Sequence, residues 1–169
     1  MERTIRVLNE MVRDGVVPRY AIGGGIGALF YIEPFETHDL DVFTDIPVVN
    51  GIVTMAPISS YLRKRGYDLQ DDLYLIDGIP VQFLPVTTGL VDEAVREAVE
   101  LSVGAERARV LRAEHLVAIM LRVGRAAKDL PRAMVMLEQA TVDMDRLQSI
   151  LSRYGLSEQY RRMVGGDSH

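Results

Sequence analysis

Residues 21–43, AIGGGIGALFYIEPFETHDLDVF, join three consecutive glycines to two acids that are separated by a single leucine. Residues 20–22 just before the glycines are short and apolar, which is typical of a buried strand entering a turn. Residues 26–32 predict an apolar helix that ends at Glu33, because the residue before a proline is disfavoured in the helical region. The stretch therefore predicts a strand, a glycine turn and a helix.

The two acids follow in residues 38–43, HDLDVF, where polar and apolar residues alternate as in a strand with one buried face. Asp39 and Asp41 would project from the same side, with their α-carbons about 7 Å apart. A hard divalent cation, Mg²⁺ or Mn²⁺, would bridge two such carboxylates and relieve their repulsion. The alternative is a solvated strand edge, on which acids are common.

The glycines also have two interpretations. A turn of Gly23, Gly24 and Gly25 leading into a helix offers free backbone N–H groups to phosphate oxygens. It is equally consistent with a tight turn alone. The sequence lacks the GxxxxGK[ST] phosphate loop, and no acid lies at the offset expected of a dinucleotide fold.

Composition limits the remaining possibilities. A chain of 169 residues with 48% apolar residues predicts one core of ordinary size. The net charge of −5 argues against a broad nucleic-acid surface and leaves nucleic acid undecided as a partner. Without cysteine there is no disulfide framework and no cysteine zinc site, and without an apolar run of about 18 residues no membrane span is expected. We therefore expect a soluble, cytoplasmic protein.

The rest of the chain predicts a small mixed sheet covered by helices. Ile5, Leu8 and Met11 recur at helical spacing and Gly15 would end that helix, while residues 57–65 form a second helix ending near Gly66. Asp77 and Gly78 stand between two apolar runs, which indicates a hairpin over residues 72–84.

Helices dominate after Pro85. The first would be capped by Thr88 and followed by a short extended piece at residues 109–111. Three further helices are predicted over residues 114–123, 130–139 and 144–153, with Asp129 and Asp143 as caps of the last two. The expected class is α+β, with an α/β core over residues 1–111, a packed C-terminal helical region over residues 112–164 and a flexible tail over residues 165–169.

Taken together, the glycine turn and the Thr37-x-Asp39-x-Asp41 strand resemble the polymerase-β-like nucleotidyltransferase superfamily. The later stretches DGIPVQFLP and RAEHLVAIMLRVGRAAKDLPRA look similar to its toxin-like, abortive-infection (AbiEii-type) branch. The resemblance covers residues 19–137.

This resemblance implies a division of labour. Gly23, Gly24 and Gly25 would hold the phosphates of a nucleoside triphosphate (NTP), and Asp39 and Asp41 would ligate Mg²⁺ or Mn²⁺. An acceptor would attack the α-phosphorus and expel pyrophosphate, with the metal neutralising the developing charge. Lys128 and Arg125 match a position near the nucleotide and would contact phosphate, or else belong to a solvated helix end.

The sequence departs from the family pattern at three positions. Gly25 stands where a Ser or Thr is usual, Gln82 stands where a third carboxylate is expected, and Met120 replaces a lysine found in related toxins. An amide oxygen ligates a cation but is a poor proton acceptor, so losing a general base at residue 82 would cost roughly 10²- to 10⁴-fold in rate. Asp77 is a poor substitute because it lies in the hairpin turn.

Three functions follow from these residues. The first is transfer of a nucleoside monophosphate to an unidentified acceptor, whether protein, RNA or small molecule. The second is a catalytically weakened module that binds nucleotide or a protein partner, within a toxin–antitoxin pair. The third is an unrelated α+β domain in which both motifs are structural.

The histidines and scattered arginines have weaker interpretations. His38 should face away from the acids, and His115 is not expected to be a ligand because no zinc spacing is present. If the acceptor is tRNA, Arg122, Arg125 and Arg132 are the candidates for a local cationic surface.

Overall fold

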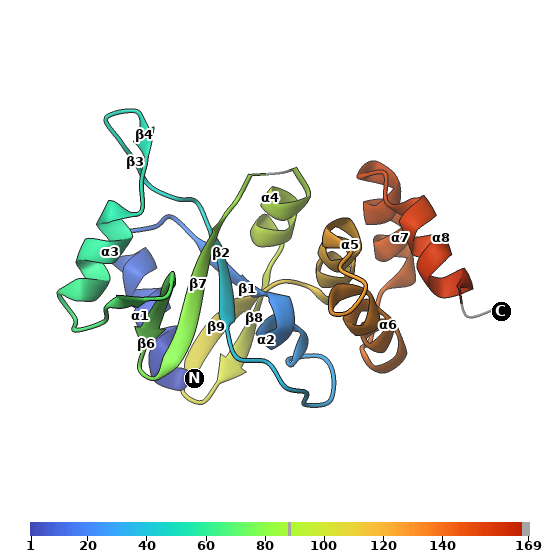
Figure 1. The fold of residues 1–169 in the computed structure, drawn as a ribbon, viewed down its shortest axis with the longest axis horizontal. Coiled ribbons are helices and arrows are strands. Elements are labelled where there is room, and N and C mark those ends of the chain that lie inside the picture. The colour runs from blue at the N-terminus through green and yellow to red at the C-terminus, as the bar shows by residue number, and fades with distance from the viewer. Residues whose placement is uncertain (88, 167–169) are drawn as a thin grey trace.

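The computed structural model describes residues 1–87 and 89–166, and its body is a mixed sheet with helices on both faces (Figure 1). Seven strands form the sheet in the order β5-β6-β7-β2-β1-β9-β8. These are β5 (Leu69–Gln70), β6 (Leu73–Ile76), β7 (Ile79–Pro85), β2 (Leu40–Thr44), β1 (Tyr20–Gly23), β9 (Glu106–Val110) and β8 (Val99–Val103). The helices are α1 (Glu2–Arg13), α2 (Gly24–Ala28), α3 (Ala56–Arg63), α4 (Gly89–Arg96), α5 (Ala113–Val123), α6 (Asp129–Gln139), α7 (Met144–Arg153) and α8 (Ser157–Gly165). The predicted α+β class with a mixed sheet is confirmed.

Each face of the sheet has its own apolar core. Inward-facing residues of α1 and α3, including Leu8 and Leu62, pack on one face against Ile22, Leu40 and Val81. On the opposite face, the core includes residues of α2, α4 and α5, and α6 and α7 pack in turn on α5. The sheet thus lies between two helical layers, and residues that alternate along a strand contribute to different cores.

The centre of the sheet brings distant parts of the sequence together. Strand β2 pairs antiparallel with β1 on one side and parallel with β7 on the other. Gly23 is opposite Asp41, and Asp41 is in turn opposite Gln82. The end of the glycine strand, the acidic strand and the later hairpin are therefore adjacent at one level of the sheet.

Several predicted elements occur as expected. Helix α1 is followed by Gly15 at a φ of +73°, and the turn between β6 and β7 has positive φ at both Asp77 (49°) and Gly78 (81°), as a primed hairpin turn requires. Helix α7 is capped by Asp143, whose carboxylate accepts a hydrogen bond from the Arg146 backbone N–H at 3.0 Å. The predicted cap at Thr88 lies outside the described residues.

Other predictions need correction. Helix α2 begins at Gly24 and ends at Ala28, not over residues 26–32, and β2 begins at Leu40, so Asp39 lies just before the strand. The extended piece at residues 109–111 is the end of a complete hairpin, β8–β9. Helix α8 was not predicted, and it continues to Gly165, where the tail was expected to begin.

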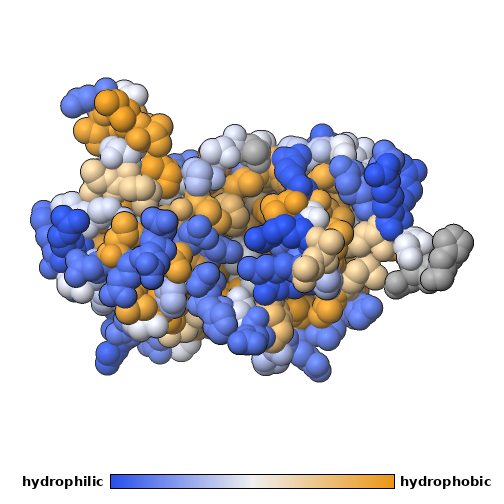
Figure 2. Space-filling model, viewed as in Figure 1, coloured by the Kyte–Doolittle hydropathy of each residue, from blue (hydrophilic) through white to orange (hydrophobic). Residues whose placement is uncertain are grey.

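A separate two-stranded hairpin, β3 (Val48–Val49) and β4 (Ile52–Val53), projects from the body of the molecule (Figures 1 and 2). Its four apolar side chains are exposed by 46–68% and belong to neither core. Among the described residues, no helix is both long and apolar enough to cross a membrane.

Candidate functional site

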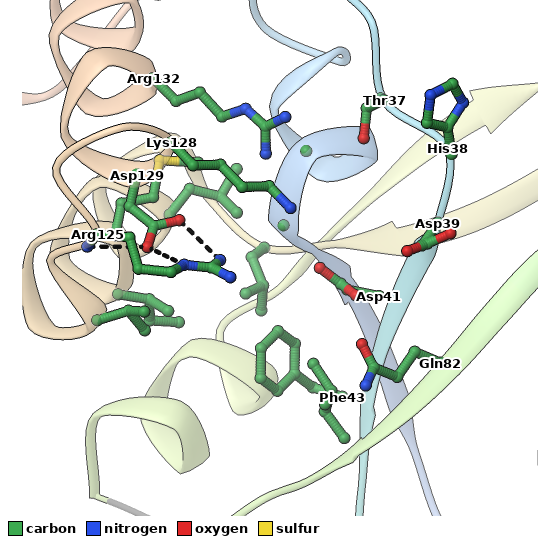
Figure 3. A pocket seen from close by; sticks show the side chains of 18 of the residues that line it. Thr37, His38, Asp39, Asp41, Phe43, Gln82, Arg125, Lys128, Asp129 and Arg132 are labelled. Carbon is green, nitrogen blue, oxygen red and sulfur yellow. Dashed lines mark hydrogen bonds and ion pairs between the residues drawn. The ribbon is translucent and has the colours of Figure 1, made fainter. Parts of the chain in front are cut away.

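A cavity of about 540 Å³ opens between the centre of the sheet and the α5–α6 segment (Figure 3). One wall is formed by the glycine turn, the loop before β2 and the strands β2 and β7; the other comes from α5 and the start of α6. Its polar lining consists of Glu36, Thr37, His38, Asp39, Asp41, Gln82, Arg125, Lys128, Asp129 and Arg132, together with Gly24 and Gly25.

The two acids of the T-x-D-x-D motif lie on the same wall of this cavity. Asp41 is half-buried on β2, and Asp39 is exposed just before the strand begins. Gln82 is the register partner of Asp41 on the adjacent parallel strand, and all three side chains line the cavity (Figure 3). The predicted juxtaposition of Gln82 with the acid pair is therefore present.

Gly24 is in direct contact with the acid pair. Its φ of +58° is unfavourable for residues with a side chain, and a Cβ atom there would overlap Asp41 Oδ2 and lie 2.8 Å from Asp41 Cγ. The carboxylate of Asp41 thus occupies the space that a side chain at residue 24 would need. The glycine turn and the acidic strand form one site because each requires the other at this point.

The electrostatics of Asp41 favour a cation. Burial raises the pKa of its carboxyl, and the neighbouring Asp39 raises it further, whereas Lys128, Arg125 and Arg132 act in the opposite direction. Within residues 1–87 and 89–166, neither Asp39 nor Asp41 has a side-chain hydrogen bond or ion pair. Two unpaired carboxylates with an amide oxygen beside them form an all-oxygen ligand set, which fits Mg²⁺ or Mn²⁺.

Three cationic side chains face the acids from the opposite wall, and they differ in their partners. Arg125 is already paired, because its Nε and Nη2 donate to Asp129 at 2.6 and 3.0 Å. Lys128 is exposed and, in the described part of the chain, its ammonium group makes no hydrogen bond or ion pair. Arg132 lies over the Phe35 ring, 4.7 Å from its centroid, and its guanidinium points toward the glycine turn (Figure 3).

The predicted cap at Asp129 is wrong. Lys128 is the N-cap of α6, without a side-chain hydrogen bond, and Asp129 is the first residue of the helix. Its carboxylate instead accepts from the Arg125 backbone N–H at 3.2 Å as well as from the Arg125 guanidinium. Burial tends to raise the pKa of Asp129, but these hydrogen bonds outweigh burial and lower it. Asp129 therefore holds the loop that positions Lys128.

The fold and this geometry were compared with known proteins. No family model matches the chain, and no curated protein sequence matches it. Three solved structures are similar to it over most of their length. The antibiotic-resistance factor ANT(2'')-Ia in solution is 14% identical with a TM-score of 0.53, covering 94% of this chain and 95% of its own. A crystal structure of ANT(2'')-Ia in complex with adenylyl-2''-tobramycin is 12% identical with a TM-score of 0.55, covering 92% and 96%.

The third is an antigenic nucleotidyltransferase-like protein from Paracoccidioides brasiliensis, which is 11% identical with a TM-score of 0.57 and covers 90% of this chain and 87% of its own. The chain has a nucleotidyltransferase fold. At these identities the likeness establishes the architecture, and the chemistry has to be argued from the side chains.

Within the nucleotidyltransferase fold, the other candidate residues lie as follows. His38 is exposed at the rim of the cavity, where its Nε2 lies 3.2 Å from Glu36 Oε1, and its ring points away from Asp41 (Figure 3). Met120 lines the cavity from α5 and is 5% exposed. Asp77 lies in its hairpin turn, 3.6 Å from Arg3, and does not line the cavity.

Sequence reasoning missed two members of the cavity. Thr37 was noted only as part of the motif, and Arg132 only as part of a surface for RNA. Both lie against Gly25: a Cβ atom on this glycine would be 2.5 Å from Thr37 Oγ1 and 3.0 Å from Arg132 Nη1. The signal for Thr37 was its place in T-x-D-x-D, whereas no local pattern links Arg132 to residue 25.

A second cluster of ionisable groups lies away from the cavity. Glu93, Glu97 and His115 have ligand atoms within 4.8 Å of one another, a spacing that would suit a metal. Glu93 already accepts hydrogen bonds from His115 Nε2 at 3.1 Å, from Tyr154 Oη at 2.5 Å and from Arg153 Nη2 at 2.5 Å. Glu97 pairs with Arg146 at 3.3 Å. Both carboxylates have cationic partners, so this cluster is a structural link between α4, α5 and α7.

Proposed function

We propose that the protein is a Mg²⁺- or Mn²⁺-dependent nucleotidyltransferase that moves a nucleoside monophosphate from an NTP to an acceptor. The observation that carries the proposal is the contact between Asp41 and Gly24, with no cationic side chain of the described residues paired to Asp41. It unites two motifs that were each ambiguous alone. A solvated strand edge does not explain a half-buried, unpaired carboxylate resting on a glycine with positive φ.

Each side chain then has a role. Asp39 and Asp41 hold the metal, with the Gln82 amide oxygen as a further neutral ligand. Gly24 and Gly25, which line the cavity, offer backbone N–H groups to the nucleotide's phosphates, whereas the predicted phosphate contact of Gly23 needs correction, because Gly23 packs against Phe43 and Leu111. Lys128 supplies positive charge, since the Arg125 guanidinium is already paired with Asp129. The metal, when bound, neutralises charge on the transferring and leaving oxygens.

In the transfer, a nucleophilic oxygen of the acceptor bonds to the α-phosphorus as the bond to the bridging oxygen breaks, and pyrophosphate leaves. The acceptor proton passes to solvent, since Gln82 cannot take it as a carboxylate would. One neighbour was crystallised with adenylyl-2''-tobramycin, so a nucleotidyltransferase fold of this size accommodates an adenylylated small molecule. We retain small molecules, proteins and RNA as acceptor classes, and the cytoplasm as the compartment where NTPs are supplied.

The proposal is tested by incubating the protein with Mg²⁺ and each of the four NTPs labelled at the α-phosphate. Label should appear on the protein, on RNA or on a supplied acceptor, and it should be absent with Asp39→Ala/Asp41→Ala. Binding of Mg-NTP is followed in parallel by thermal shift, with EDTA as the metal-free control. Failure of the wild type both to bind and to transfer would exclude this function.

A second candidate function is favoured by one residue, Gln82. A neutral amide beside Asp41 suits binding better than turnover, so the chain would act as a nucleotide-binding or protein-binding module. A toxin–antitoxin pair of the AbiEii type is the setting that the resemblance implies for such a module. Nucleotide binding without transfer is the outcome expected of it.

Gln82→Asp separates the two candidates. The new carboxylate would stand opposite Asp41 and would supply both charge and a proton acceptor, so we expect turnover to rise by roughly 10²- to 10⁴-fold if the site is otherwise competent. Initial rates of pyrophosphate release measure the gain. Gln70→Asp, in the short edge strand β5, is the matched control and should leave the rate unchanged. An unchanged rate in Gln82→Asp would argue against a catalytic position at residue 82.

A further inference from the structure

The hydroxyl of Thr37 occupies the space beside the buried residue Gly25. A Cβ atom built on Gly25 would lie 2.5 Å from Thr37 Oγ1 and 3.1 Å from Thr37 Cβ. Thr37 belongs to the loop that precedes β2, so the hydroxyl comes from a segment twelve residues away in sequence (37 minus 25). At this point of the cavity wall, the backbone comes from Gly25 and the side chain comes from Thr37.

The groups that meet here are hydrogen-bond donors. Arg132 Nη1 lies 3.0 Å from the same point on Gly25, and the Arg132 guanidinium has no carboxylate partner among the described residues. The Thr37 hydroxyl likewise has no hydrogen-bond partner in residues 1–87 and 89–166, although it lines the cavity. Lys128 points into the same space (Figure 3). Two cations and an unpaired hydroxyl suit an anion rich in acceptor oxygens.

We propose that Thr37 is a nucleotide-binding residue, whose hydroxyl donates a hydrogen bond to a phosphate oxygen of the bound triphosphate and takes the place of a side chain that Gly25 lacks. This inference rests on the proposed function, because it assumes that the cavity binds an NTP. It assigns the phosphate end of the cavity to Thr37 and Arg132, on the side of the acids away from Gln82 (Figure 3).

A packing role for Thr37 makes a different prediction from a binding role. Thr37 is half-buried, and its methyl and hydroxyl have similar size, so valine would keep the shape of the side chain while removing the hydroxyl. Because a hydrogen bond to a charged phosphate contributes more than one between neutral groups, Thr37→Val should weaken triphosphate binding by about 10- to 150-fold. Thr37→Ser keeps the hydroxyl and should bind within about twofold of the wild type.

Moving the hydroxyl provides a stricter test. Gly25→Ser alone would place its Cβ against Thr37 Oγ1 and should weaken binding. The double variant Gly25→Ser/Thr37→Gly moves the hydroxyl from residue 37 to residue 25 and removes the clash with the Thr37 side chain. Gly25 has an ordinary negative φ, so serine is compatible with its backbone. We expect the double variant to recover most of the affinity that Gly25→Ser loses.

The measurement is isothermal titration with Mg-tripolyphosphate and, separately, with each Mg-NTP, because tripolyphosphate reports on phosphate contacts without a base. Circular dichroism and thermal unfolding establish that each variant is folded. Weakening in Thr37→Val with both probes, and recovery in the double variant, would support the inference. Equal affinity of Thr37→Val and wild type would overturn it while leaving the proposed function intact. Absence of binding by the wild type itself would overturn both.

Discussion

At the scale of single residues, the site depends on Gly24 having no side chain. Its φ of +58° would cost an alanine about 1–2 kcal/mol, and the added Cβ would also displace the Asp41 carboxylate. We predict that Gly24→Ala abolishes the stabilisation of the protein by Mg-NTP, measured as a thermal shift.

Gly66→Ala is the matched control for this variant. Gly66 has a φ of +81° with nothing within 4 Å of its Cβ position, so it bears the same kind of strain without the clash. We expect a comparable loss of stability and an unchanged response to Mg-NTP. If Mg-NTP stabilised Gly24→Ala and Gly66→Ala equally, the contact between Gly24 and Asp41 would not be required for ligand binding.

The charge of Asp41 makes a separate prediction about stability. Because its pKa is raised in the folded state, Asp41 favours folding only at acid pH, and this contribution is lost as the pH rises through the folded pKa. In EDTA at pH 7, Asp41→Asn should therefore unfold at the same or a higher temperature than the wild type, and the gain should shrink at acid pH. The same variant should lose its response to Mg²⁺.

Asp45→Asn is the control for that experiment. Asp45 accepts from Arg19 Nε at 2.7 Å just beyond the end of β2, so removing its charge should lower stability, by up to about 1 kcal/mol for a pair near the surface. A loss of stability in Asp41→Asn similar to that in Asp45→Asn would contradict the assignment of Asp41 as an unpaired metal ligand.

Residues differ in how far the sequence predicts them. Asp39 and Asp41 were predictable because alternation along a strand is local, and Gln82 because a hairpin signal placed it on a neighbouring strand. The contact of Thr37 with Gly25 was not, because it depends on how a loop without regular structure returns across the turn. The pairing of Arg125 with Asp129 was missed because the two residues were interpreted separately, as a phosphate contact and a helix cap.

At the scale of elements, the Glu93 cluster joins α4 to α5 and α7. Burial tends to raise the pKa of Glu93, but hydrogen bonds from Tyr154, His115 and Arg153 outweigh burial and lower it to about 2. The stabilisation is fully present above the ordinary pKa of a glutamate and is lost as the pH falls from there toward 2. Glu93→Gln should thus destabilise the protein by about 1.5–3 kcal/mol at neutral pH and by a smaller amount at pH 3, where part of the stabilisation is lost.

Urea unfolding of wild type and Glu93→Gln at pH 7, 5 and 3 measures this difference. Glu97→Gln is the control, since the side chains of Glu97 and Arg146 are 38% and 39% exposed and such pairs contribute about 0–1 kcal/mol. If the difference in unfolding free energy between Glu93→Gln and the wild type did not change with pH, the negative charge of Glu93 would not be the source of the stabilisation.

The accuracy of the predicted elements followed the strength of their local signals. Helices α1, α3, α5 and α7 and the β6–β7 hairpin have clear periodicity or a turn of fixed type, and they were predicted within a few residues. Helix α2 is shorter than its apolar sequence suggested: it ends at Ala28, and the turns that follow carry Tyr31, whose Oη donates to the Leu111 carbonyl at 2.8 Å. The β8–β9 hairpin carries charged residues on its outer positions, which obscured its apolar face.

At the scale of the whole molecule, the sheet separates two cores, and the cavity lies at the edge of one of them. The predicted mixed sheet with helices on it was correct because the order of elements along the chain allows few other arrangements. The sequence did not predict that the β2 and β7 strands would be parallel, or that the α5–α6 segment would close the cavity from the opposite side. These features come from packing between distant segments, which the hydrophobic periodicity of the sequence does not reveal.

The projecting β3–β4 hairpin has a practical consequence for anyone handling this protein. Residues 46–62 contain no charged side chain, and the hairpin offers two open edges with valine and isoleucine on its surface. Such a segment tends to recruit further strands when samples are concentrated. Val48→Lys or Val53→Lys would protect those edges with charge and leave the candidate cavity, to which the hairpin contributes no residue, unaltered.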